Sequence, residues 1–142
     1  MDRDGNNQIN LTSHQSRDTD PQFSPSGSGL LFITNRDGLD EIYYAELEWY
    51  GGYTRYEITN QVNVSNHPAY DGQPQFSPDG SKIVFQSARD STFEIYLVDV
   101  DGNNLVNISN HSANDLDPQF SPDGQNILYV SDRDGDDEIF IM

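Results

Sequence analysis

The feature that most constrains the fold is a short phrase that occurs three times. It reads DPQFSPSG at Asp20–Gly27, GQPQFSPDG at Gly72–Gly80 and DPQFSPDG at Asp117–Gly124. A second phrase, R-D-x-x-x-E-I, follows each copy, at Arg36–Ile42, Arg89–Ile95 and Arg133–Ile139. Because the two phrases recur in the same order three times, they indicate one structural unit that occurs three times in the chain.

Each repeat reads as four short strands, which we call a, b, c and d. In the best example, Pro-Gln-Phe-Ser is followed by a Pro-Asp-Gly turn and then by a β-branched and aromatic run at Lys82–Ser87. Glu94–Val98 is the third strand, and Asp101-Gly102 is a hairpin turn that leads to the alternating fourth strand Leu105–Ser109. Four antiparallel strands in about 44 residues are typical of a β-propeller blade.

The first predicted strand of the chain is a strand d, not a strand a. Asp2–Gly5 aligns with Asp99–Gly102, which makes Gln8–Thr12 a strand d, whereas Glu138–Met142 aligns with a strand c. We therefore divide the chain into repeats 1–47, 48–98 and 99–142, with a c–d hairpin insertion at 48–57. The prediction is an all-β half-propeller with a strand d at its start and a strand c at its end.

Three blades are fewer than the smallest propellers contain, and an open arc exposes apolar sheet faces and an unpaired edge. We expect two chains to exchange their terminal strands and close a six-bladed ring with two-fold symmetry. The alternative is that the chain is half of a longer propeller. The first partner predicted for this chain is thus a second copy of itself.

Charge and composition limit the other partners. The formal net charge of −17 repels phosphate backbones, so we expect no nucleic-acid partner. No apolar run reaches ten residues, from which we expect neither membrane insertion nor a signal peptide in this chain. The absence of cysteine excludes disulfides and thiolate chemistry. Basic protein surfaces and cations are the partners that this charge favours.

The segment Asp117–Met142, with its Ser-Pro-Asp-Gly turn and acidic b–c loop, resembles the WD-like Pro-Asp repeat of TolB-like β-propellers. The likeness covers the chain apart from Glu48–Glu57. It implies six blades, a periplasmic or otherwise extracytoplasmic location, and a binding platform for a protein or peptide. Similar blades also form the non-catalytic domain of prolyl-oligopeptidase-like enzymes, so the resemblance does not choose between these functions.

A histidine and an aspartate recur at the spacing H-x₃-D in every d–a loop. We predict that they lie on the top face of the propeller, around the mouth of its channel. The six candidate binding residues are His14, Asp18, His67, Asp71, His111 and Asp115. Imidazole and carboxylate together suit a divalent metal ion, but residues repeated in every blade also suit a structural role, with each histidine bonded to the neighbouring blade.

The last b–c loop has three aspartates at alternate positions, Asp132, Asp134 and Asp136. Carboxylates on a tight turn suit a calcium ion, which makes Ca²⁺ a possible cofactor. The equivalent loop at Ala88–Glu94 has lost most of these ligands. An arginine–carboxylate pair to the next blade explains the same residues without a metal.

The insertion carries four aromatic residues, Trp49, Tyr50, Tyr53 and Tyr56. Exposed rings at a hairpin tip suit a protein partner or a sugar. Cross-strand ring pairs that only stabilise the hairpin are the alternative.

No nucleophile elbow and no phosphate-binding loop occurs in the sequence, so we expect a protein that is not an enzyme. The favoured function is a protein- or peptide-binding platform on an acidic top face. The alternatives are a carbohydrate- or calcium-dependent lectin-like module and the non-catalytic propeller of a peptidase.

Overall fold

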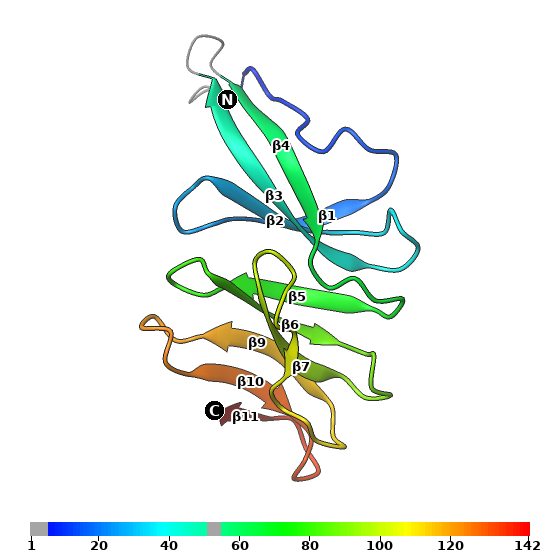
Figure 1. Cartoon of the computed structure of the whole chain (residues 1–142). Coiled ribbons are helices and arrows are strands. Elements are labelled where there is room, and N and C mark those ends of the chain that lie inside the picture. Colours follow the sequence, from blue (N-terminus) through cyan, green and yellow to red (C-terminus); the bar gives the residue numbers. More distant parts are fainter. Residues whose placement is uncertain (1–5, 51–54) are drawn as a thin grey trace.

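The computed structural model describes residues 6–50 and 55–142, which form eleven strands in three antiparallel sheets (Figure 1). The strands are β1 (Asp18–Phe23), β2 (Gly29–Thr34), β3 (Glu41–Tyr50), β4 (Arg55–Asn63), β5 (Asp71–Phe76), β6 (Lys82–Ser87), β7 (Glu94–Asp99), β8 (Val106–Asn107), β9 (Asp115–Phe120), β10 (Ile127–Ser131) and β11 (Glu138–Ile141). The predicted all-β propeller architecture is confirmed. In these residues, no helix is long and apolar enough to cross a bilayer.

The sheets follow one another in chain order and constitute three blades (Figure 1). The first blade has the strand order β1-β2-β3-β4, and the second has the order β5-β6-β7-β8. The third blade has three strands, β9, β10 and β11, so β11 is its outer edge among the described residues. Each blade thus begins with the repeated Pro-Gln-Phe phrase in strand a.

The innermost strand of each blade contains a bulge at the residue before proline. Asp20, Gln73 and Asp117 have positive φ values of 50°, 51° and 50°. The pairing between strands a and b shifts register at the same place in all three blades. The repeated proline explains the shift, because it has no N–H to donate to the ladder.

Apolar faces of successive sheets form the core. Leu31 and Ile42 of the first blade pack with Phe76 and Phe85 of the second. The next junction repeats this arrangement, since Ile95 of the second blade packs in one cluster with Tyr129 of the third, and Phe120 lies against it. The phenylalanine of the repeated phrase therefore fills the junction with the preceding blade. This explains why the phrase recurs once per blade.

Two of the predicted strands differ in the structure, and one forms as predicted. The structure forms no strand at Gln8–Thr12, and this segment lies beside β4 of the first blade. The predicted strand Leu105–Ser109 shortens to β8. By contrast, the predicted terminal strand forms as β11.

The insertion lengthens β3 and β4 of the first blade into a hairpin that projects from the sheet (Figure 1). Trp49 pairs with Tyr56 across these two strands. Residues 51–54, which include the predicted contact residue Tyr53, lie outside the described residues, as do residues 1–5 of the first repeat.

Candidate binding surface

Five loops gather at one end of the blades and form the surface that we call the acidic rim. They are the b–c loops 35–40, 88–93 and 132–137 and the d–a loops 64–70 and 108–114. Backbone hydrogen bonds join loops of neighbouring blades, from Asp71 N to Asp40 O at 2.9 Å and from Asp115 N to Phe93 O at 2.7 Å. The rim is therefore one connected surface.

The arginine of each b–c loop forms an ion pair with the aspartate that begins strand a of the same blade. The Nη2 atoms of Arg36, Arg89 and Arg133 lie 3.4, 3.2 and 3.0 Å from carboxylate oxygens of Asp18, Asp71 and Asp115. Each pair lies within one blade, so the predicted pairing to the next blade is wrong. Strands a and b are hydrogen-bonded neighbours, and the arginine after strand b therefore folds back over its own sheet.

Each of these arginines also stacks on two aromatic rings. The Arg89 guanidinium carbon lies 5.5 Å from the ring centre of Phe85 and 4.6 Å from that of Tyr96. Arg36 and Arg133 repeat this contact with the rings of strands b and c in their own blades. Cation–π attraction adds to the ion pair in such a site. The guanidinium is consequently neutralised and covered.

Two tyrosines complete the arrangement by donating to a loop aspartate. Tyr43 Oη donates to Asp37, and Tyr96 Oη donates to Asp90. Burial, together with this hydrogen bond, raises the pKa of each tyrosine to about 12. The same hydrogen bond holds the pKa of Asp90 below its usual value. The third blade has Phe140 at this position and lacks the hydroxyl donor.

The predicted top-face residues therefore divide into two groups. Asp71 and Asp115 are fully buried, and Asp18 is largely buried beside Arg36. These carboxylates stabilise the blade. They do not lie at the surface, where the sequence predicted that they bind a ligand. The three histidines lie in the loops themselves.

The histidines make local contacts instead of the predicted bonds to the neighbouring blade. His14 Nδ1 accepts from Ser16 N at 3.2 Å, and His111 Nδ1 accepts from Ala113 N at 3.1 Å. Each imidazole thus caps its own loop. In contrast, His67 Nδ1 is buried and has no hydrogen-bond partner among the described residues.

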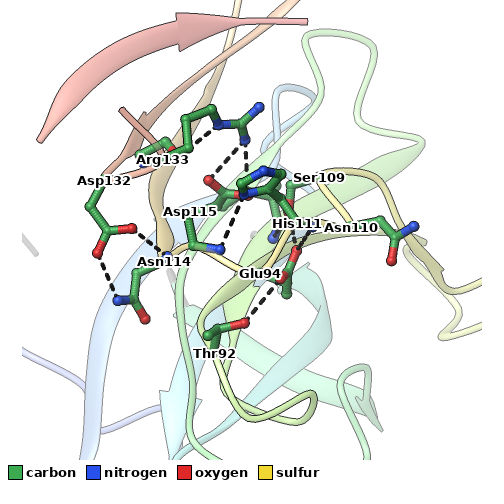
Figure 2. A network of polar contacts seen from close by, with 12 residues as sticks. Thr92, Glu94, Ser109, Asn110, His111, Asn114, Asp115, Asp132 and Arg133 are labelled. Atoms are coloured by element: carbon green, nitrogen blue, oxygen red, sulfur yellow. Dashed lines mark hydrogen bonds and ion pairs between the residues drawn. The ribbon is translucent and has the colours of Figure 1, made fainter. Parts of the chain in front are cut away.

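A buried glutamate ties the loop after strand d to strand c, as Figure 2 shows for Glu94. Its Oε2 accepts from Ser109 Oγ at 2.6 Å and from His111 N at 3.1 Å, while Oε1 accepts from Thr92 Oγ1 at 3.1 Å. Our sequence reasoning missed this role. The signal was present, because a glutamate occurs in every copy of the repeated R-D-x-x-x-E-I phrase.

The three aspartates of the last b–c loop differ in their surroundings. Asp132 accepts from Asn114 N at 2.8 Å and from Asn114 Nδ2 at 2.9 Å, which lowers its pKa (Figure 2). Asp134 and Asp136 are exposed. Across residues 6–50 and 55–142, no three His, Asp or Glu side chains are grouped closely enough to hold a metal ion.

A hollow of about 420 Å³ opens on the rim between the first and second blades. Asp37, Leu39 and Glu41 line it from the first b–c loop and β3, and Asn66, His67 and Pro68 line it from the following d–a loop. Leu39 is exposed, so the hollow offers an apolar contact between carboxylates. Its chemistry suits a side chain with an aliphatic stem and a cationic end.

The aromatic hairpin presents a second feature, away from the rim. The Trp49 and Tyr56 ring centres are 4.8 Å apart, and Phe23 lies 6.3 Å from Tyr56. Tyr50 Oη donates to Glu48 at 2.7 Å. The rings pack across the strands, yet Trp49 stays 55% exposed. Both interpretations of the insertion, a stabilised hairpin and a contact surface, therefore remain compatible with its geometry.

Comparison with known proteins places these features in a family. A family model described as the TolB beta propeller domain matches residues 53–142. An uncharacterized protein from Agrobacterium fabrum is 30% identical, and the aligned region covers 74% of this chain and 36% of that protein. The resemblance predicted from the Pro-Asp repeats is thereby confirmed.

Two solved structures have the same fold. A putative TolB from Agrobacterium tumefaciens matches with a TM-score of 0.65 at 23% identity, over 87% of this chain and 46% of that one. A puromycin-hydrolyzing peptidase from Mycobacterium tuberculosis matches with a TM-score of 0.70 at 16% identity, over 88% of this chain and 20% of that one. This chain thus spans less than half of each relative.

The buried ion pairs predict a large difference between two arginine variants. Arg89→Met leaves the fully buried Asp71 without its cation, and we expect it to lower the free energy of unfolding by about 3 to 5 kcal/mol. Arg17→Met breaks the exposed pair with Asp40 and is the control, with an expected loss much smaller than that of Arg89→Met. Urea denaturation measures both. Equal losses would contradict the structural role of the buried pair.

The two buried tyrosines predict a dependence of stability on alkaline pH. Their pKa is about 12 in the folded state and lies near 10 when unfolded, so their contribution is complete below pH 10 and is lost as the pH rises towards 12. We expect the double variant Tyr43→Phe, Tyr96→Phe to lose less stability than the parent between these pH values. Denaturant titrations at pH 8 to 12 test this, with exposed Tyr70→Phe as the control. A parallel decline in the double variant and the parent would contradict it.

Proposed function

Because this chain belongs to the TolB beta propeller domain family, we propose that it is a non-enzymatic platform whose acidic rim binds a basic segment of a partner protein. The net charge of −17 supports a cationic partner. The arginines under the rim are paired internally, whereas Asp90, Asp134 and Asp136 are exposed on its loops. The rim therefore presents uncompensated negative charge.

The observation that carries the proposal is the hollow on the rim, where Asp37 and Glu41 lie beside the exposed Leu39. Asp37 and Glu41 line the same hollow and attract a lysine or arginine side chain, while Leu39 contacts its aliphatic stem. The hollow is thus an anchor point on a wider acidic surface.

The local contacts of the histidines support a binding role over a catalytic one. Nucleophilic catalysis by serine requires a base within hydrogen-bond reach of the hydroxyl. Among the described residues, no hydrogen bond joins a histidine ring to a serine hydroxyl, and His14 and His111 use Nδ1 to cap their own loops. The hydrolysis named for the Mycobacterium tuberculosis relative is therefore not included in our proposal for this chain.

One further part of the proposal, the location of the protein, rests on the family alone. We place the protein outside the cytoplasm, as the TolB likeness implies. We do not assign a calcium ion, because the described carboxylates form no group that suits one.

A carbohydrate ligand at the aromatic hairpin is the second candidate function. The exposed Trp49 beside Tyr56 supports it, because adjacent rings form a platform for the apolar face of a sugar. Trp49 is the single tryptophan of the chain, so its fluorescence reports this site directly. Oligosaccharides that bind there must change its emission, and unchanged emission across a glycan panel contradicts this candidate.

Selection from a random peptide display library tests the rim. We expect the enriched peptides to contain lysine or arginine, and a synthetic peptide of the enriched sequence to bind more weakly as salt rises. Asp37→Asn keeps the Tyr43 hydrogen bond but removes one charge from the hollow, and we expect an affinity about fivefold lower by calorimetry.

The control is Asp101→Asn, which removes an exposed charge from the β7–β8 turn at the opposite end of the blades. It must leave the affinity unchanged. Enrichment of peptides without basic residues, or equal effects of the two variants, would overturn the proposed rim function.

A further inference from the structure

An aromatic pair lies on the rim of the second blade, which has a neighbouring blade on both sides. Tyr70, the residue before strand a, meets Phe93 of the b–c loop edge-on, with ring centres 5.9 Å apart. Tyr70 is 40% exposed, and Phe93 is half-buried. The second blade therefore presents an apolar contact within the acidic rim.

The repeat does not require aromatic residues at these two positions. In the first blade the equivalent residues are Arg17 and Asp40, which form an ion pair. In the third blade the equivalent of Tyr70 is Asn114, which bonds to Asp132 of the b–c loop. Polar contacts thus join the same two segments in the other two blades. The fold of the blade therefore does not account for the two rings.

The surroundings of the rings hold them in place. Gly72 has no side chain, and a Cβ at that position would lie 2.8 Å from Tyr70 Oη and 3.0 Å from Tyr70 Cε1. The tyrosine ring therefore lies directly against the backbone of β5. The main chain is also bonded, from Ala88 N to Tyr70 O at 3.0 Å and from Asp115 N to Phe93 O at 2.7 Å. Rings that are fixed before binding lose little conformational entropy when a ligand packs on them.

The aromatic pair adjoins the hollow between the first two blades. Pro68 lines the hollow and belongs to the same d–a loop as Tyr70, so the Cα atoms of the two residues are at most about 7 Å apart. The backbone bond from Asp71 N to Asp40 O holds this loop against the b–c loop of the first blade, next to Leu39. The apolar side of the hollow and the aromatic pair are therefore within reach of one short peptide.

Negative charge surrounds this apolar surface. Asp37 and Glu41 line the hollow, and Asp90 is exposed in the b–c loop of the second blade. Arg17 is paired with Asp40, so its charge does not cancel theirs. A lysine or arginine is attracted by these carboxylates, and an apolar side chain beside it contacts the rings. A ligand with both side chains thus matches both features of the surface.

We propose, on the basis of the proposed function of the rim, that Tyr70 and Phe93 bind an apolar side chain of the basic partner segment, next to its lysine or arginine. The cationic side chain enters the hollow, and the neighbouring apolar side chain packs on the exposed part of Tyr70. A few aromatic anchors commonly supply most of the binding energy of an interface. The partner is therefore a segment in which a basic and an apolar residue are adjacent, not a uniformly basic one.

Two blocked pentapeptides of equal charge test the proposal on the 142-residue chain. Lys-Lys-Phe-Lys-Lys contains an apolar residue, whereas Lys-Lys-Ser-Lys-Lys does not. We expect the phenylalanine peptide to bind about tenfold more tightly by calorimetry in low-salt buffer. Because the two charges are equal, the ratio of the affinities reports the central side chain alone. This comparison uses the unchanged chain, so it does not depend on whether a variant folds.

A double variant transfers the polar pair of the first blade to the second. Tyr70→Arg with Phe93→Asp leaves the net charge unchanged and introduces the residue types that the first blade has at these positions. We expect this variant to bind the two peptides with equal affinity, because the aromatic contact is removed.

The matched control makes the same charge-neutral change at the opposite end of the blades. Leu105 and Val106 are exposed apolar residues at the β7–β8 turn, 39% and 53% exposed. Leu105→Arg with Val106→Asp must retain the about tenfold preference of the parent for the phenylalanine peptide.

Equal affinity of the parent for the two peptides overturns the proposal and leaves the binding of basic segments at the rim in place. A preference that the Tyr70→Arg, Phe93→Asp variant retains, or that the control also loses, overturns it as well, because the apolar side chain is then bound elsewhere. If neither peptide binds the parent, the proposed function of the rim is wrong, and this inference fails with it.

Discussion

The buried arginine–aspartate pair is the interaction on which each blade depends. It fixes the first residue of strand a to the turn after strand b, and the guanidinium is covered by rings of strands b and c. One side chain therefore links three strands at the rim end of the sheet. Because a buried pair is stable only with both partners present, the R-D-x-x-x-E-I phrase and the aspartate of the d–a loop must recur together.

The same pairs explain why the rim is acidic. Each b–c loop contains an arginine whose side chain folds back over the sheet. Its positive charge is neutralised there by a buried aspartate and does not balance the negative charge at the surface. The remaining loop carboxylates are then not balanced by the cations nearest to them. The buried ion pairs, which recur in every blade, thus leave the rim with the negative charge that we expect its partner to recognise.

The number of neighbours that a blade has explains how much of its apolar surface is exposed. The second blade is flanked on both sides, so Ile83, Phe85 and Ile95 are fully buried. The first and third blades each have a neighbour on one side, and their outward faces hold Phe23 and Ile141, which are exposed.

The sequence by itself determined the repeat, the four strands of a blade and the all-β fold, because alternation of apolar residues and turn chemistry act over a few neighbouring positions. It also indicated strand d at Gln8–Thr12, where the structure forms no strand. Only the tertiary structure decided which partners the polar residues take: Arg36 turns to its own blade, Glu94 holds the loop after strand d, and His67 has a buried nitrogen without a partner among the described residues. Such contacts join residues far apart in the chain, and their choice depends on the burial and direction of both side chains, which no local pattern specifies.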